Sequence, residues 1–258
     1  MIFATTNQKG GVGKTTTVLN LGSYLASLGY RVLLIDIDPQ ANLTSGLGIN
    51  LREVKEKPTV YDVLIKNTDI LSAVIKTRIP NLDLLPSEIE LAGAEIEMVG
   101  AFSRENILKK AIDSVVDQYD LIFIDCPPSL GLLTINGLVA AQKVLIPVQA
   151  EYFALEGLGQ LINTINLVKT NLNPNLEIGG VIITMFDNRT NLSKDVKQEI
   201  ESFFDKKMFK TVIPRNIKLS EAPSHGLSIQ EYDPNSTGAE SYKKLAKELI
   251  KKFEIKKI

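Results

Sequence analysis

The sequence predicts an α/β fold, in which a mostly parallel β-sheet is covered by helices on both faces. Three observations support this prediction. Short, continuously apolar runs alternate along the chain with longer segments of helical periodicity. Two of the apolar runs end in an acidic residue, which is typical of buried parallel strands that reach a ligand-binding edge. The first run leads into a glycine-rich loop and then into a helical pattern.

The individual elements follow from these patterns. Apolar runs predict strands at residues 2–4, 31–36, 120–125, 143–148 and 178–184, with an edge strand at 210–213. Helical periodicity follows the glycine loop and recurs near residues 103–117, 131–141, 155–171, 192–205 and 239–254. The alternation implies right-handed βαβ crossovers. Residues 50–100 are less regular, and we expect helices and one extra strand, at 82–86, beside the sheet. Because no linker or repeat interrupts the chain, residues 1–258 are expected to form a single domain.

Composition narrows the functional classes. The 258 residues are 44% hydrophobic and 23% charged, as in ordinary soluble proteins. The net charge of −1 and the pI of about 6.0 provide no global basic field, so nucleic-acid binding would require a local patch. The single cysteine, Cys126, excludes an intramolecular disulfide and a zinc or iron–sulfur cluster. No signal peptide precedes the first strand and no apolar run approaches about 18 residues, so we expect a cytoplasmic protein.

The glycine-rich loop is the strongest motif in the chain. Between strand and helix, its glycines allow backbone N–H groups to point at phosphate oxygens, and the helix dipole favours the same negative charge. Lys14 is expected to reach the β- and γ-phosphates of a nucleotide, and the Thr15 hydroxyl to hold Mg²⁺. Structural glycine turns are common at such positions, but the Gly-Lys-Thr sequence favours phosphate binding. The predicted nucleotide-binding residues here are Lys9, Gly10, Gly11, Val12, Gly13, Lys14, Thr15 and Thr16.

Acidic residues follow two of the expected strands. Asp36 and Asp38 come at the end of the strand at 31–36, and alternation along a strand places both side chains on the same side. Asp125 ends the strand at 120–125, where its carboxylate would hold Mg²⁺ through water. One of the first two acids could instead cap the turn that begins at Pro39. Their place beside the phosphate loop favours a functional role.

A second lysine, Lys9, begins the loop and is too early in the sequence to be the usual phosphate lysine. The run Lys-Gly-Gly-Val-Gly-Lys-Thr-Thr resembles the deviant loop of the ParA/MinD class of P-loop ATPases. The resemblance implies that Lys9 reaches across a dimer interface to the nucleotide of the partner subunit. It also implies that Asp38 holds the attacking water and is needed for hydrolysis, while Asp36 supports the magnesium shell. Lys9, Lys14 and Asp38 are therefore the expected catalytic residues.

Blocks spread over nearly the whole chain resemble the chromosomal ParA (Soj) type. These blocks are Leu91-Ala92-Gly93-Ala94-Glu95, Thr134-Ile135-Asn136-Gly137-Leu138, Pro147-Val148-Gln149-Ala150-Glu151-Tyr152 and Ser220-Glu221-Ala222-Pro223-Ser224-His225-Gly226. This resemblance implies chromosome or plasmid partition driven by ATP and Mg²⁺. An ATP-dependent sandwich homodimer would coat nucleoid DNA without sequence preference. A ParB-type centromere-binding protein would stimulate hydrolysis and release the dimer.

The same resemblance suggests further site residues. The segment 213–218 is similar to the loop that packs on adenine in this family, which makes Pro214 and Asn216 candidates for nucleotide binding. Arg189, Arg215 and Lys218 match basic positions implicated in non-specific DNA binding. An alternative for Arg189 is an ordinary ion pair with Asp187, since surface pairs of this kind are common, or a cap on the helix at Asn191.

Two other functions compete with partition. A MinD-like ATPase that cycles on membranes would use a basic amphipathic helix at the C-terminal end, and residues 242–258 are rich in lysine. Their apolar stripe is narrow and lacks tryptophan, so we expect this helix to pack on the sheet and to provide no stable membrane anchor. A module that binds nucleotide without hydrolysing it is the other alternative. The presence of both Asp38 and Asp125 argues against it.

Overall fold

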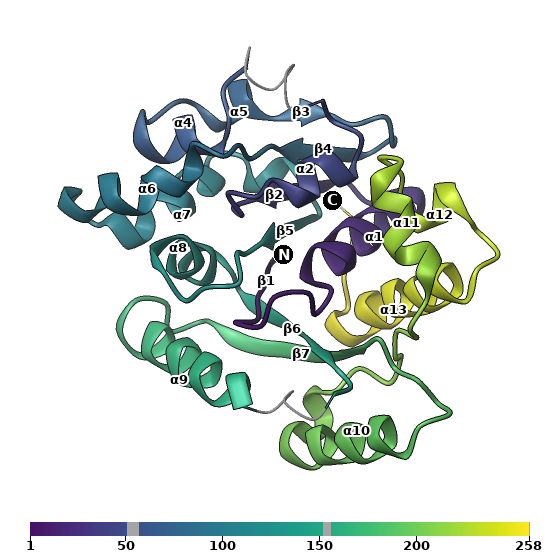
Figure 1. Ribbon diagram of the computed structural model, residues 1–258. Coiled ribbons are helices and arrows are strands. Elements are labelled where there is room, and N and C mark those ends of the chain that lie inside the picture. The colour runs from purple at the N-terminus through teal and green to yellow at the C-terminus, as the bar shows by residue number, and fades with distance from the viewer. Residues whose placement is uncertain (51–56, 152–155, 258) are drawn as a thin grey trace.

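The computed structural model describes residues 1–50, 57–151 and 156–257, and in this part of the chain seven strands form one sheet (Figure 1). The strands are β1 (Ile2–Thr5), β2 (Val32–Asp36), β3 (Ile75–Lys76), β4 (Leu82–Leu85), β5 (Leu121–Asp125), β6 (Lys143–Gln149) and β7 (Glu177–Thr184). Their spatial order is β3-β4-β2-β5-β1-β6-β7, and every neighbouring pair is parallel except β3 and β4. The predicted fold class is therefore confirmed.

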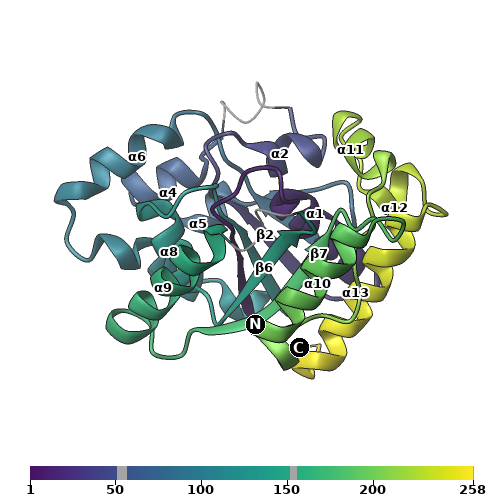
Figure 2. The ribbon, with the colours of Figure 1, turned by 60° about the horizontal axis from the view of Figure 1, so that its bottom comes forward.

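Helices cover both faces of the sheet (Figures 1 and 2). One face is covered by α1 (Lys14–Ser27), α2 (Asn42–Gly46), α11 (Ile217–Ser224), α12 (Ile229–Tyr232) and α13 (Thr237–Phe253). The other face is covered by α4 (Val60–Ile65), α5 (Ile70–Ala73), α6 (Leu91–Glu97), α7 (Ile107–Asp113), α8 (Leu132–Ala140), α9 (Glu156–Asn171) and α10 (Asn191–Phe204). Short 3₁₀ turns are η1 (Met98–Gly100), η2 (Arg104–Asn106), η3 (Val116–Gln118) and η5 (Asp205–Lys207).

The period of two along each strand produces these two cores. In β2, Val32 and Leu34 belong to the core beneath α1 and α13, whereas Leu33 and Ile35 belong to the core beneath the opposite helices. All four side chains are fully buried. A strand with apolar residues at every position is stable only between two covering layers, which is why the apolar runs in the sequence correspond to central strands.

The predicted edge strand at residues 210–213 is wrong. This segment runs beside β7 and makes isolated contacts with it, including a hydrogen bond of 2.8 Å from the Ile213 amide to the Ile183 carbonyl. The amides of Lys210 and Thr211 instead donate to the carboxylate of Glu248 on α13, at 2.7 and 2.9 Å. Because a side chain from a distant helix takes these donors, a continuous ladder does not form. The expected helix at 103–117 is also shorter, since only α7 is α-helical there.

The last helix, α13, packs on the sheet as predicted. Its residues Tyr242, Leu245 and Leu249 are buried against α1, and Phe253 lies edge-on to Phe3 of β1 with ring centroids 5.3 Å apart. Most of its lysines point into solvent. Among the described helices, none is both long enough and apolar enough to cross a membrane.

Candidate nucleotide-binding site

The loop between β1 and α1 is open toward solvent, and hydrogen bonds from the Asn7 side chain hold it against β6. Gly11 and Gly13 have positive φ angles of 73° and 86°, a region that residues with a Cβ seldom adopt. The buried side chain of Asn7 donates to the Pro147 carbonyl at 2.8 Å and accepts from the Lys9 amide at 3.0 Å. Its amide group therefore joins the loop to β6 and holds the backbone turn in place.

Two oppositely charged groups lie at the base of this loop. Burial lowers the pKa of Lys14, while the nearby carboxylates of Asp125 and Asp38 oppose that shift. Burial raises the pKa of Asp125 well above its usual range, and the charge of Asp36 adds to this effect. Both carboxylate oxygens of Asp125 are buried, and neither forms a hydrogen bond of normal geometry with a described residue.

A buried carboxylate without a well-formed hydrogen bond is costly, so the presence of one here indicates a position shaped for a ligand. The Thr15 hydroxyl, on the phosphate loop, favours the charged form of Asp125 and so partly opposes the rise in its pKa. One carboxylate and one hydroxyl beside a phosphate loop are the ligands that Mg²⁺ takes when it also binds nucleotide phosphates. The residues present therefore fit the predicted magnesium site.

Asp36 and Asp38 have different surroundings although they are two residues apart. The carboxylate of Asp36 accepts from the amide and hydroxyl of Thr44, at 2.9 and 2.7 Å, and from the Asp38 amide at 3.2 Å. Burial raises the pKa of Asp36 to about 7. Asp36 thus anchors the start of α2, and its predicted support of the magnesium shell stays a prediction. Asp38 lines the cavity above the phosphate loop, where its carboxylate also accepts from the Gln40 amide at 3.0 Å.

Two cavities meet at the phosphate loop. The first, of about 550 Å³, contains the loop, Asp38 and Pro128. The second, of about 210 Å³, is lined by Pro214 and Asn216, as predicted, and has mainly apolar walls. Gly13, Thr16 and Met185 line both, so the cavities form one trough. Sequence reasoning did not identify several walls of the second cavity, namely Thr184, Met185, Leu219 and Tyr242. No local motif marks these residues.

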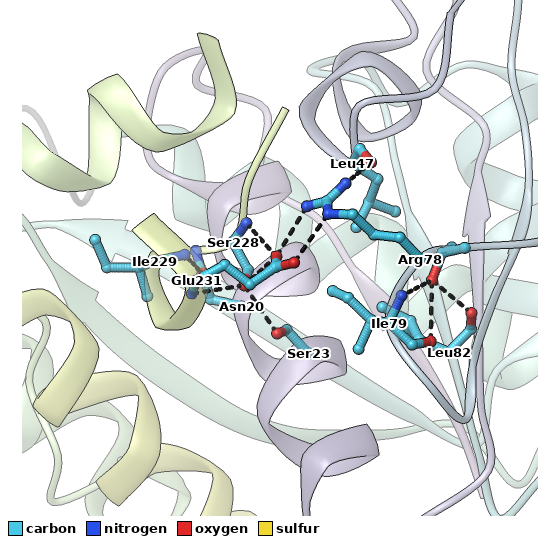
Figure 3. A network of polar contacts seen from close by, with 10 residues as sticks. Asn20, Ser23, Leu47, Arg78, Ile79, Leu82, Ser228, Ile229 and Glu231 are labelled. Atoms are coloured by element: carbon cyan, nitrogen blue, oxygen red, sulfur yellow. Dashed lines mark hydrogen bonds and ion pairs between the residues drawn. The ribbon is translucent and has the colours of Figure 1, made fainter. Parts of the chain in front are cut away.

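A polar network holds α12 against α1, the helix that follows the phosphate loop (Figure 3). The guanidinium of Arg78 donates twice to Glu231, at 2.9 and 2.8 Å, and also donates to the Leu47 carbonyl at the end of α2. Glu231 in turn accepts from the amide and hydroxyl of Ser228, and Ser228 contacts Ser23 of α1 at 3.0 Å. The network fixes α12 beside α1 and links both helices to the end of α2.

A close backbone contact joins α2 to the end of α11. Gly48 and Gly226 both have positive φ angles, and a Cβ on Gly226 would lie 2.5 Å from the Cα of Gly48. Because glycine has no side chain, the two segments can approach each other closely. Pro223 and Ser224 consequently line the cavity above the phosphate loop. The trough is therefore enclosed by segments that are far apart in the sequence.

The second loop lysine, Lys9, pairs within its own chain. Its ammonium lies 3.6 Å from the Glu151 carboxylate, which also contacts the guanidinium of Arg215 at 3.2 Å. Gln149 donates to the same carboxylate at 2.6 Å. Lys9 and Glu151 are each more than a third exposed, so this pair contributes about 1 kcal/mol or less.

The three predicted DNA-binding cations are all paired with acids. Arg189 makes a two-pronged contact with Asp187, at 2.9 and 2.7 Å, and the charge of Arg215 also acts on Asp187. The ion pair considered as the alternative for Arg189 is therefore present. Lys218, on α11, lies 3.0 Å from Glu221. The side chain of Arg189 is nevertheless 88% exposed, so its pairing leaves it accessible.

Comparison with known proteins shows the family to which this chain belongs. A family model described as an AAA domain matches residues 1–178. The chain is 58% identical over 248 residues to the sporulation initiation inhibitor protein Soj of Bacillus subtilis (strain 168), which covers 96% of this chain and 97% of that protein. It is 52% identical to the chromosome-partitioning ATPase Soj of Treponema pallidum (strain Nichols), over 95% of this chain and 94% of that protein.

The chain belongs to the Soj/ParA family of chromosome-partitioning ATPases. Two solved structures with the same fold are described with bound nucleotide. One is described as cobyrinic acid a,c-diamide synthase from Mycobacterium smegmatis with bound ADP and magnesium; it is 37% identical, with a TM-score of 0.86 over 98% of this chain and 95% of that chain. Another is the septum site-determining protein MinD from Pyrococcus horikoshii with Mg-ADP. It is 26% identical, with a TM-score of 0.76 over 96% of this chain and 95% of that chain. This Soj/ParA chain therefore shares its fold with nucleotide-bound proteins that carry different functional names.

Proposed function

We propose that this protein binds ATP with Mg²⁺ in the trough and hydrolyses it to drive chromosome or plasmid partition. The observation that carries the proposal is the buried Asp125 carboxylate, which forms no hydrogen bond of normal geometry with a described residue and lies beside Lys14 and Thr15. Bound Mg²⁺ would offset the charge of the phosphates and of Asp125. Membership of the Soj/ParA family supports the partition role.

Each half of the trough suits one part of ATP. The loop N–H groups and the Lys14 ammonium would bind the phosphates, while the apolar cavity beside Pro214 and Asn216 would take the adenine. Asp38 lines the phosphate half, where its carboxylate would orient water for in-line attack. No covalent intermediate is needed, since positioning and electrostatics account for most of the catalysis of phosphoryl transfer.

The active form is proposed to be an ATP-bound sandwich dimer that coats nucleoid DNA and leaves it when a ParB-type protein stimulates hydrolysis. Dynamic and static light scattering with ATP, with ADP and without nucleotide would test this, with and without duplex DNA. We expect a doubling of mass with ATP alone and slow turnover that rises with DNA and partner. A protein that stays monomeric with ATP under all of these conditions would contradict the proposal.

Lys9→Ala is expected to leave nucleotide binding nearly unchanged but to prevent the ATP-bound dimer. The proposed target of Lys9 is the partner's nucleotide, and its weak, exposed pair with Glu151 would cost little to break. ATP affinity and light scattering should be measured on the same preparation. A normal ATP-dependent dimer of this variant would exclude the role across the interface.

DNA binding is expected to depend on ATP, to ignore base sequence and to weaken steeply with salt. A chain of net charge −1 is weakly attracted to DNA, whereas a dimer would present its local cationic patches twice. Arg189→Ala should keep the dimer and weaken binding to all sequences alike. For each phosphate that Arg189 neutralises, the substitution should lower the slope of log affinity against log salt by about one.

Lys109→Ala is the matched control for Arg189→Ala, because Lys109 is also an exposed cation paired with an acid but lies on α7. It should bind like the wild type. If Arg189→Ala also binds like the wild type across the salt titration, the DNA surface lies elsewhere. The exposed lysines of α13 would then be the next candidates.

A membrane-cycling role of the MinD type has less support. Lipid insertion of α13 would require Tyr242, Leu245 and Leu249 to leave the core, and burial of each stabilises the fold by about 1.5–3 kcal/mol. Flotation with anionic liposomes and ATP should therefore leave the protein in the dense fraction. Co-flotation that depends on ATP would favour the membrane role.

A further inference from the structure

Glu151 lies beside the phosphate loop and contacts two cations at once. It comes two residues after the end of β6, and β6 pairs with β1, the strand that leads into the loop. Its Oε2 atom lies 3.6 Å from the Lys9 ammonium. Its Oε1 atom accepts from the Arg215 guanidinium at 3.2 Å and from the Gln149 side-chain amide at 2.6 Å. The two donors on Oε1 hold the carboxylate in place, and Oε2 is left to Lys9.

The backbone on both sides of this contact is also held. The Lys9 amide donates to the Asn7 side chain at 3.0 Å, and the Lys9 carbonyl accepts from the Lys14 ammonium at 3.2 Å. Ala150, directly before Glu151, donates its amide at 3.1 Å to the carbonyl at the end of β7. The distance between Lys9 and Glu151 is therefore set by the packing of the loop and the sheet, in addition to the two side chains.

The pair competes with the role proposed for Lys9 in the dimer. Lys9 carries a single positive charge, so a contact with the partner's nucleotide competes with the contact to Glu151. The pair is partly exposed, which keeps it weak enough to open. When Lys9 leaves, Arg215 and Gln149 remain on the carboxylate, so opening does not strand an unpaired acid.

We propose that Glu151 is a positioning residue for Lys9, which holds the Lys9 side chain within its own chain until the dimer forms. The inference rests on the proposed function, in which Lys9 crosses the interface to the partner's nucleotide. Each protomer must then exchange the Glu151 contact for the new one before the dimer closes. Glu151 thereby raises the protein concentration at which the nucleotide-bound dimer appears.

The size of the effect follows from the exposure of the pair. An exposed ion pair changes an equilibrium by a factor of about 1.4 to 5. One such pair opens in each protomer, so two factors multiply when a dimer forms. Removing the Glu151 charge should therefore lower the dissociation constant of the dimer by a factor of about 2 to 30.

The test compares Glu151→Gln with Glu201→Gln. Glu201 is equally exposed and pairs with Lys197 at 3.0 Å, but both residues of that pair lie on α10. Static light scattering over a range of protein concentrations gives the dissociation constant of the dimer. Mg²⁺ and a non-hydrolysable ATP analogue are present and DNA is absent, so a change in hydrolysis rate does not alter the amount of dimer. We expect tighter dimerisation of Glu151→Gln and the wild-type value for Glu201→Gln.

Two further measurements separate positioning from a merely structural role. The difference between Glu151→Gln and the wild type should shrink at about 1 M salt, where charges are screened beyond about 3 Å. The double variant Lys9→Ala/Glu151→Gln should stay monomeric like Lys9→Ala, because the gain acts only through Lys9. Thermal unfolding checks that the variants remain folded.

A wild-type or weaker dimer of Glu151→Gln would overturn the positioning role and leave the proposed function intact. A double variant that dimerises as well as Glu151→Gln would also overturn it, since the gain would then not pass through Lys9. A wild-type protein that stays monomeric with ATP and with the analogue would instead overturn the proposed function and the inference that rests on it.

Discussion

Lys14→Ala is expected to abolish ATP binding at ordinary nucleotide concentrations. The variant loses the only lysine ammonium that the structure places at the base of the described phosphate loop, beside Asp125 and Asp38. Removing one partner of a buried, hydrogen-bonded charge contact costs about 2–5 kcal/mol, so the affinity should fall by a factor of roughly 30 to 4,000. Calorimetric titration with ATP and Mg²⁺ measures this directly.

Lys9→Ala is the matched control for this prediction, because it removes the other lysine of the same loop. Its ATP affinity should stay within about threefold of the wild type. The unfolding temperature of Lys14→Ala should also be measured, because the Lys14 charge lies beside the buried carboxylates of Asp125 and Asp38 and its loss could change the stability of the fold. An affinity for ATP close to that of the wild type would show that the phosphates bind elsewhere.

Asp38→Ala is expected to bind ATP and to dimerise, but to hydrolyse ATP about 10²–10⁴ times more slowly. The variant loses a carboxylate that faces the phosphate half of the trough, while Lys14 and Thr15 remain. Because release requires hydrolysis in the proposed cycle, the variant should stay on DNA. Single-turnover hydrolysis together with a DNA-release assay measures both effects.

Asp38→Asn separates charge from position. An asparagine oxygen can still accept the hydrogen bond from the Gln40 amide, so the local turn should persist. We expect this variant to be as slow as Asp38→Ala, since it no longer carries the negative charge that favours proton transfer from water. Near-normal turnover in either variant would move the catalytic role to another carboxylate, with Glu151 the first to test.

Much of the fold was predictable because its signals are local. Continuous apolar runs identified the central parallel strands, and the Gly-Lys-Thr loop identified the start of α1. The ends of β2 and β5 also lie in register, with Asp36 beside Asp125, as expected for acids at one edge of a parallel sheet. These features depend on side-chain period and backbone conformation within a few residues.

The prediction at residues 210–213 failed for a reason that local patterns do not contain. The segment has the composition of a strand, but Glu248 on α13 takes two of its backbone donors. The antiparallel strand β3 was not located either, because two residues show no periodicity.

The sequence by itself determined the α/β class, the phosphate loop and the acids that accompany it, because each depends on residues close together in the chain. Only the tertiary structure decided which acid lacks a well-formed hydrogen bond among the described residues, which residues wall the apolar cavity, and that Lys9 pairs with Glu151. These properties arise where distant segments meet and exclude water. Burial and pairing there depend on the packing of the whole domain rather than on any one segment.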